Sequence, residues 1–177
     1  MYSPNGSSIV VGIAPEISDA VLHSAANLAR RLDAELVCVC VDTDSVLVEE
    51  RPDGTAITRV VMPATLDGGP YLPATASENV SARVDEAIEA RLNDVLGTKI
   101  QWRCVATAGD PADRLASIAK KLDAIMIVIG TRKPGFRGTL REFVRGSVAV
   151  RLAHRQHVPI LVVPQSPHSK PLPWELS

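Results

Sequence analysis

The stretch GDPADRLASIAKKLDAIMIVIG, residues 109–130, places a helix pattern directly before an apolar strand pattern. Asp110 and Pro111 favour a helix start, as the N-cap and within the first turn. The apolar side of the predicted helix consists of Leu115, Ile118, Ala119 and Leu122. Residues 125–130 are apolar or glycine throughout, which is typical of a strand covered on both faces. This stretch therefore predicts one unit of a parallel α/β sheet.

The same alternation of strand and helix extends over most of the chain. Further strands are predicted at 7–14, 35–42, 99–107 and 158–164. Further helices are predicted at 15–34, 78–97 and 147–157. The first of these starts at Pro15 and Glu16. The inward face of the second consists of Val80, Val84, Ile88, Leu92 and Val95. The pattern predicts a flavodoxin-like α/β domain: a five-stranded parallel sheet with helices on both faces and right-handed crossovers. Because strand 99–107 alternates apolar and polar residues, we expect it at an edge of the sheet.

One segment interrupts this alternation after the second strand. Residues 46–61 hold two alternating runs around Pro52, Asp53 and Gly54, which predicts a small inserted hairpin. Residues 62–77 are rich in Pro and Gly and are predicted to form an irregular loop. The domain is expected to span 8–164, with flexible tails at 1–7 and 165–177.

The composition restricts the class of protein. The 177 residues are 46% hydrophobic but only 3% aromatic, so Val, Ile, Leu and Ala must build the core. A net charge of −1 shows no bias toward nucleic acid or a membrane surface. No apolar run approaches the roughly 20 residues that span a bilayer, and the N-terminus lacks a signal-peptide pattern. We therefore expect a cytoplasmic protein with no nucleic-acid or membrane partner.

The cysteine, histidine, serine and aspartate side chains are the candidates for catalysis or metal binding. Cys38 and Cys40 share one strand face, and Cys104 lies on the predicted edge strand. Because the sequence has no Cys-x-x-Cys motif, these cysteines are interpreted as buried free thiols in preference to a metal or redox pair. His154 and His157 lack further ligands at suitable spacing and are interpreted as surface residues. Capping explains Asp110, and also Ser147 at a helix start. No set of residues amounts to a catalytic site, so no catalytic residue and no metal ligand is assigned.

The loop after residue 130 is locally basic. Residues 131–147, TRKPGFRGTLREFVRGS, carry five basic side chains against one Glu142. Gly146 and Ser147 open a helix, whose N-terminus favours anions. Two interpretations stay open: a site for phosphate or another anion, and a solvated loop whose arginines pair with acidic neighbours.

Three stretches together resemble the universal stress protein family, over about residues 8–164. They are IVVGIAPEIS (9–18), AGDPADRLASIAKKLDAIMIVIGTR (108–132) and RGSVAVRLAHRQHVPILVVP (145–164). The resemblance implies a fold of the adenine nucleotide alpha hydrolase type and a homodimer through the closing strand 158–164. It also implies a role in the stress response.

The resemblance further implies an ATP site, with Mg²⁺ and at most weak ATP hydrolysis, in a Gly-rich loop. The implied nucleotide-binding residues are Gly130, Arg132, Lys133, Gly135, Gly138, Gly146, Ser147, Val148 and Val41. The family pattern is G-x2-G-x9-G-[ST]; here position 133 is Lys, and Gly146 comes three residues later than the pattern places it. Ala14 stands where the family usually has an Asp. The alternative is the family's non-nucleotide class, which acts through protein contacts.

Overall fold

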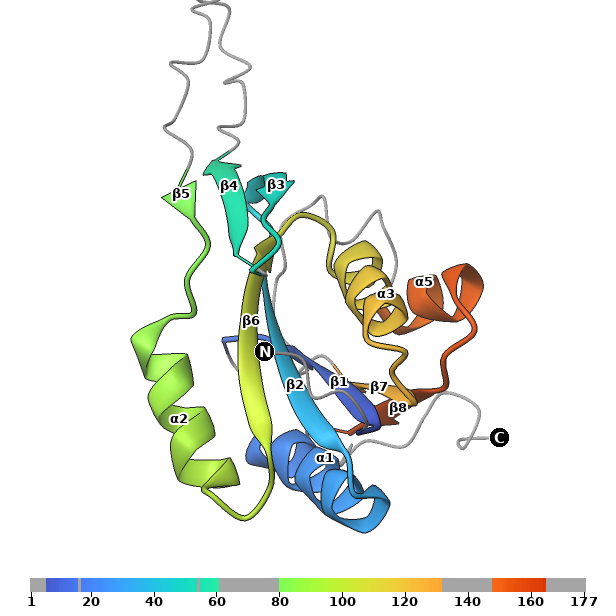
Figure 1. Ribbon diagram of the computed structural model, residues 1–177. Coiled ribbons are helices and arrows are strands. Elements are labelled where there is room, and N and C mark those ends of the chain that lie inside the picture. Colours follow the sequence, from blue (N-terminus) through green and yellow to red (C-terminus); the bar gives the residue numbers. More distant parts are fainter. Residues whose placement is uncertain (1–5, 16, 54, 61–79, 132–147, 165–177) are drawn as a thin grey trace, which may run out of the picture.

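The centre of the molecule is a five-stranded parallel sheet (Figure 1). The computed structural model describes residues 6–15, 17–53, 55–60, 80–131 and 148–164. The strand order is β6-β2-β1-β7-β8, with strands β1 (Ser8–Ile13), β2 (Glu35–Asp42), β6 (Trp102–Ala108), β7 (Met126–Gly130) and β8 (Ile160–Val163). The predicted parallel sheet is confirmed, and β6 lies at an edge as its alternating pattern predicts.

Helices cover both faces of this sheet, as predicted. The helices are α1 (Asp19–Leu32), α2 (Glu86–Leu96), α3 (Pro111–Lys121) and α5 (Val148–Arg155). One core layer joins α1 and α2 to the sheet, and the other joins α3 and α5 to it. Side chains of β1 alternate between the layers: Val11 packs toward α1 and Val10 toward α3, and both are fully buried. The aliphatic composition thus fills two layers without aromatic residues.

Gly12 of β1 allows α3 to pack close to the sheet. A Cβ atom at Gly12 would lie 3.1 Å from Leu115 Cδ1 and 3.3 Å from Ile129 Cγ2. Those distances are tighter than ordinary van der Waals contact, so a side chain would push Leu115 away. The glycine therefore determines how closely the α3 layer approaches β1.

A second, antiparallel sheet follows β2. It contains β3 (Ser45–Glu50), β4 (Ala56–Val60) and β5 (Val80–Ser81) in the order β3-β4-β5. The predicted hairpin at 46–61 is confirmed by the pairing of β3 with β4. The loop predicted at 62–77 and the two predicted tails, apart from residues 6 and 7, lie outside the described residues.

Two helix starts were predicted too early. The helix predicted at 15–34 begins at Asp19, after a turn in which the Ile17 N–H donates to the Ala14 carbonyl at 3.0 Å. The helix predicted at 78–97 begins at Glu86, where the Asp85 side chain accepts from the Ala87 N–H. A local pattern misses both boundaries because caps and turns decide them.

The strand β5 lies inside the region predicted as helix 78–97. Val80 pairs with Thr58 and Ser81 with Ile57 of β4. The periodic apolar pattern was wrong for Val80 and Val84, which precede the helix, but right for Leu92, which is 1% exposed. Pairing with a strand 22 positions away satisfies backbone groups that a local helix would otherwise satisfy.

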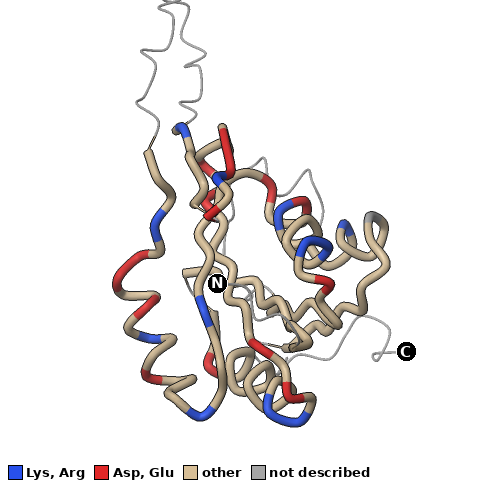
Figure 2. The backbone as a smooth tube through the Cα atoms, viewed as in Figure 1, with Lys and Arg blue, Asp and Glu red and all other residues tan. Residues whose placement is uncertain are grey.

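Charged residues lie on both sides of the junction between the small sheet and α3 (Figure 2). Glu50 of β3 accepts from Lys121 at 2.5 Å and from Arg114 at 3.3 Å. The hydrogen bond from Lys121 is the main reason that the pKa of Glu50 is lowered. These pairs connect the inserted sheet to the main domain.

Among the described residues, no helix is both long and apolar enough to cross a bilayer.

Candidate functional site

The strand order of the sheet reverses between β1 and β7, a switch point at which open α/β sheets form their ligand-binding crevice. The chain leaves β1 through α1 on one face, and leaves β7 toward α5 on the other face. β1 and β7 are neighbours, with Val11 opposite Val128. Connections that diverge to opposite faces leave space between them, and ligands of open α/β sheets bind at such a point. Ala14 follows β1 here, and Gly130 ends β7.

Three of the predicted nucleotide-binding residues are described, and all three lie at this edge. Gly130 is the last residue of β7 and pairs with Val163 of β8. Val41 lies one residue before the end of β2, and Val148 is the first residue of α5. The side chains of Val41 and Val148 pack against the same core layer, the one under α3 and α5. The end of β2, the end of β7 and the start of α5 thus lie at one edge of the sheet.

The remaining six predicted residues lie outside the described residues. They are Arg132, Lys133, Gly135, Gly138, Gly146 and Ser147. Glu16, which follows Ala14 by two positions, also lies outside them.

A tight turn connects β6 to α3 at the same edge. The Gly109 N–H donates to the carbonyl of Asp42 at 2.9 Å, which joins this turn to the end of β2. Gly109 has a φ of +115°, a conformation that side chains other than hydrogen rarely allow. The Asp110 side chain then accepts from the Asp113 N–H at 3.1 Å, so the predicted cap is confirmed.

Asp110 also forms an ion pair that the sequence did not reveal. Both of its carboxylate oxygens accept from the guanidinium of Arg151 on α5. The two side chains are 12% and 17% exposed, so the pair is largely shielded from water. Arg151 also lies 3.9 Å from Asp113. Because 41 positions separate the partners, no local motif indicates the contact.

The pair changes how Asp110 titrates. Burial raises the pKa of Asp110, but hydrogen bonds from Arg151 and from the Asp113 N–H outweigh it, and the net pKa is lowered. Hydrogen bonding to Asp110 in turn raises the pKa of Arg151. Both groups are therefore charged at neutral pH, and the pair connects the start of α3 to α5 beside the crevice.

A buried hydroxyl near the end of β6 has no hydrogen-bond partner among the described residues. Thr107 is 3% exposed and lies opposite Val41 of β2. A buried polar atom without a partner costs free energy, so it is available to a ligand or water at this edge. Thr107 is not among the predicted site residues; the signal for it is its place near the carboxyl end of a strand.

A pocket of about 360 Å³ opens at the end of β1. Its walls come from the β1–α1 turn and from the first turns of α2, which the sequence analysis did not connect with the site. The lining residues are Ala14, Pro15, Ile17, Asp85, Ala87, Ile88, Arg91 and Leu92. Most of this lining is apolar, and Asp85 and Arg91 supply charge. Arg91 contacts Asp19 of α1 at 2.7 Å, an exposed pair that joins the two helices.

The family can be assigned from the sequence and the fold together. The family model described as "Universal stress protein family" matches residues 7–164. This chain belongs to the universal stress protein family. The match covers the main sheet and its helices, together with the inserted sheet between β2 and α2.

Solved structures show the same fold at low identity. A universal stress protein in complex with cAMP is 19% identical, with 91% of this chain and 98% of that chain covered and a TM-score of 0.52. A universal stress protein from Archaeoglobus fulgidus is 19% identical, and the alignment covers 89% of this chain and 98% of that chain with a TM-score of 0.52. The protein UspA from Lactobacillus plantarum is 16% identical, and the alignment covers 91% of this chain and 99% of that chain with a TM-score of 0.50. All three have the flavodoxin-like, adenine nucleotide alpha hydrolase-like fold predicted here.

In this universal stress protein, the turn after β1 differs from the family pattern. Ala14 offers only its backbone carbonyl, which already accepts from the Ile17 N–H. Among the residues that line the described pocket, the carboxylate is that of Asp85, at the N-cap of α2. One oxygen of Asp85 accepts from the Ala87 N–H at 2.8 Å. An acidic group is thus present beside the pocket, but it comes from a different element.

Proposed function

We propose that this universal stress protein is a regulatory module that binds an adenine nucleotide at the carboxyl edge of its sheet and acts in the stress response as a homodimer. The observation that carries the proposal is the pocket of about 360 Å³ at Ala14, which follows β1 where the strand order reverses. A universal stress protein with the same fold was crystallised with cAMP, which supports an adenine nucleotide as the class of ligand.

The adenine base of the proposed nucleotide fits the chemistry of this pocket. Ile17, Ile88 and Leu92 offer apolar walls for a flat ring. Asp85 offers a carboxylate that can accept a hydrogen bond from an exocyclic amino group. Apolar walls with a few polar groups are typical of small-molecule sites, in which the polar groups determine orientation.

The phosphates belong at the other side of the crevice, near the start of α5. The loop 131–147 brings Arg132 and Lys133 close in sequence to the end of β7, and Gly146 and Ser147 immediately precede α5. Backbone N–H groups at a helix start bind phosphate oxygens, and nearby guanidinium and ammonium groups strengthen that binding. Gly130, Gly135, Gly138, Val41 and Val148 complete the proposed nucleotide site. Where ATP is bound, Mg²⁺ would accompany its phosphates.

Removing two basic side chains is expected to weaken nucleotide binding at least tenfold. The variant Arg132→Ala/Lys133→Ala loses two charge-assisted hydrogen bonds, each worth about 1.5–3 kcal/mol. Isothermal titration with ATP, AMP and cAMP measures the change. The matched control is Arg30→Ala/Arg31→Ala in the last turn of α1, which removes the same charge at the far end of a helix. Equal weakening in both variants would indicate a general charge effect and no site.

Two further measurements separate this proposal from the alternative, a module that works through protein contacts alone. Mass spectrometry of nucleotides released from freshly purified protein should find an adenine nucleotide. Ala14→Asp, which restores the family's carboxylate, should raise the preference for ATP over GTP. If folded, nucleotide-free protein gives no heat with any nucleotide, the nucleotide site is ruled out and the protein-contact module is favoured.

The homodimer is proposed to form through β8, the edge strand opposite β6. Val162 is 41% exposed on this strand, and Val150 is 55% exposed on the adjoining α5. An unpaired apolar edge strand is a surface for pairing with a second chain. Pro159 lacks an N–H, so pairing should centre on residues 160–163.

Val162→Lys is expected to convert the dimer to a monomer, because a charge would be buried in the interface. Leu161 is unsuitable for this test because its side chain packs against the core of the domain. Light scattering after size exclusion measures the mass, and Val46→Lys, at an exposed position on β3, is the control. A dimer that persists in Val162→Lys would place the interface elsewhere.

A further inference from the structure

Three thiols gather on one face of the sheet, away from the proposed nucleotide site. Cys38 and Cys40 lie two positions apart on β2, and Cys104 lies on β6 directly opposite Cys38. All three side chains belong to the layer between the sheet and helices α1 and α2. All three are free cysteines. The alternation of the strands explains why they share this face.

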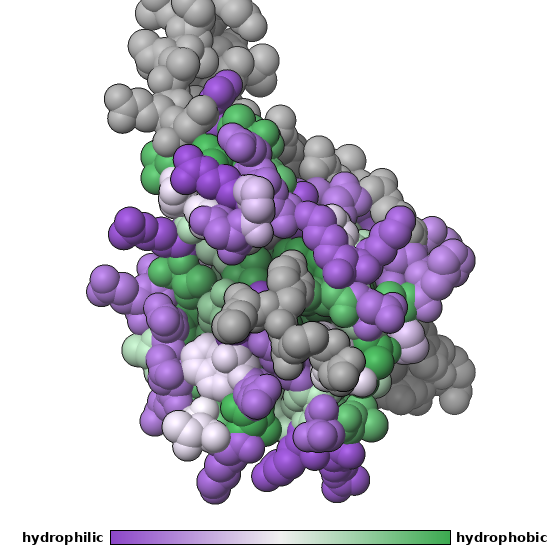
Figure 3. Space-filling view, viewed as in Figure 1, coloured by the Kyte–Doolittle hydropathy of each residue, from purple (hydrophilic) through white to green (hydrophobic). Residues whose placement is uncertain are grey.

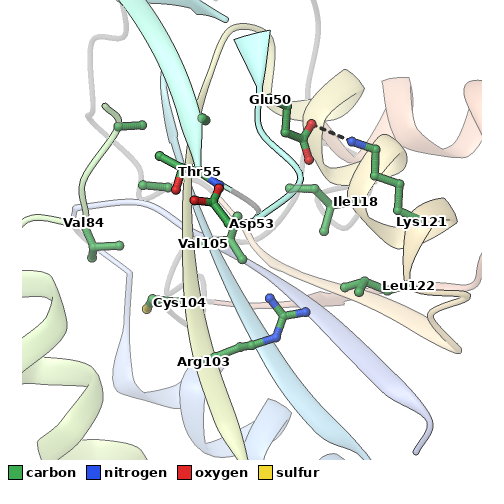
Figure 4. A pocket seen from close by; sticks show the side chains of 13 residues that line it. Glu50, Asp53, Thr55, Val84, Arg103, Cys104, Val105, Ile118, Lys121 and Leu122 are labelled. Carbon is green, nitrogen blue, oxygen red and sulfur yellow. Dashed lines mark hydrogen bonds and ion pairs between the residues drawn. The ribbon is translucent and has the colours of Figure 1, made fainter. Parts of the chain in front are cut away.

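The three thiols differ in their access to solvent. Cys38 is fully buried, whereas Cys40 and Cys104 are both partly buried, and of these two Cys104 lies on the edge strand. Cys104 also lines a pocket of about 310 Å³ between β6, the small sheet and α3 (Figure 4). In that view its sulfur lies on the opposite side of β6 from the Arg103 side chain. Apolar surface is visible below the small sheet, with hydrophilic residues around it (Figure 3). A small reagent can therefore approach Cys104 from the edge of the sheet.

The neighbouring thiols make Cys104 the most acidic of the three. Hydrogen bonds from Cys38 and then from Cys40 lower the pKa of the Cys104 thiol, because they stabilise its thiolate. The same hydrogen bonds, together with burial, raise the pKa of Cys38 and of Cys40. The thiolate is the nucleophilic form of cysteine, so reactivity concentrates on Cys104, which is partly buried and lies on the edge strand.

The geometry favours chemistry between two sulfurs. Among the described residues, no group of three or more His, Cys, Asp and Glu side chains is placed to hold a metal ion. Partners in register on adjacent strands are about 4.8 Å apart, within the range of Cα distances that a disulfide spans. Cys40 is displaced by two residues along β2, so its Cα lies about 8 Å from that of Cys104, beyond that range. Cys38 is therefore the partner for Cys104.

We propose that Cys104 is a peroxide-reactive thiol and that Cys38 is its resolving thiol. The Cys104 thiolate attacks one oxygen of a hydroperoxide, the O–O bond breaks, and the products are a sulfenic acid and hydroxide or alkoxide. As the Cys38 sulfur attacks the Cys104 sulfur, the Cys38 proton passes to the leaving hydroxide, so that a disulfide forms and water is released. Two electrons pass from the two thiols to the peroxide, so the thiols are oxidised to a disulfide and the peroxide is reduced. This modification site is independent of nucleotide binding and couples β2 covalently to β6.

The test treats the folded, reduced protein with a small excess of hydrogen peroxide. Free thiols should fall from three to one, and non-reducing peptide mapping should find Cys38 linked to Cys104. In Cys38→Ser no disulfide should form, and a sulfenic acid at Cys104 should be trapped by dimedone. In Cys104→Ser the rate of thiol loss should fall at least tenfold.

Cys40→Ser is the matched control, because serine keeps a hydrogen-bond donor at that position. It should still form the Cys38–Cys104 disulfide. The proposal is overturned if Cys104 stays unmodified in folded protein, or if the disulfide contains Cys40. It is also overturned if the wild-type thiols react no faster than the protein unfolds, measured by circular dichroism under the same conditions.

Discussion

Replacing Leu152 by alanine is expected to lower the free energy of unfolding by about 3 kcal/mol, within the range measured for buried Leu→Ala changes. Leu152 is 0% exposed, and it is the residue through which the eight-residue helix α5 enters the core layer under α3. The cavity left by the change lies between α5 and the sheet, where a short helix has few other apolar contacts. Urea denaturation followed by circular dichroism measures the loss.

The control for Leu152 is Val150→Ala on the same helix. Val150 is 55% exposed, so its change should stay within about 0.5 kcal/mol of wild type. Under the proposed function, Leu152→Ala should also weaken nucleotide binding, because α5 begins at the crevice. A stability loss below about 1 kcal/mol in Leu152→Ala would contradict the packing of α5 described above.

Replacing Asp110 by asparagine is expected to cost about 2 kcal/mol at pH 7, the size of a charge-assisted hydrogen bond. Asparagine can still cap α3, but it cannot pair with Arg151 as a charged group. Because the pair is only 12–17% exposed, water screens it less than a surface pair. Asp113→Asn, at a side chain that is 49% exposed and 3.9 Å from Arg151, should cost much less.

The effect of Asp110 should depend on pH in one direction. Its pKa is lowered in the folded protein, so its contribution is fully present above the unfolded pKa of about 3.9 and is lost as the pH falls through the folded pKa. The difference in stability between wild type and Asp110→Asn should therefore shrink below about pH 4. Denaturation curves at pH 7 and at about pH 3 measure it. A difference that does not change with pH would show that charge is not its cause.

The architecture of the main sheet follows from local patterns of residues. The uninterrupted apolar run of β7 predicted a strand covered on both faces, and the alternation of β6 predicted an edge strand; both are confirmed. Asp110 and Pro111 placed the start of α3 correctly, since capping is decided within one turn of chain. Gly130, Val41 and Val148 lie at one edge because parallel strands and the helices after them share that edge, while their part in binding a nucleotide stays a prediction.

Features that depend on distant partners were not predictable in this way. The pairing of β5 with β4 overrode a helical pattern at Val80, because a cross-strand partner supplied the hydrogen bonds. The Asp110–Arg151 pair requires α3 and α5 to lie side by side, which no residue spacing encodes.

The sequence by itself determined the order of the strands of the main sheet and of the helices around it, the two-layer aliphatic core and the family of this protein, because periodicity and capping act over a few residues. Only the tertiary structure decided which side chains meet across elements. It placed Asp85 beside Ala14 in the pocket, and Cys104 opposite Cys38 on the edge strand. The physical reason is register: which residues face each other across strands and helices depends on how whole elements pack, and one position of shift would turn each side chain to the other face.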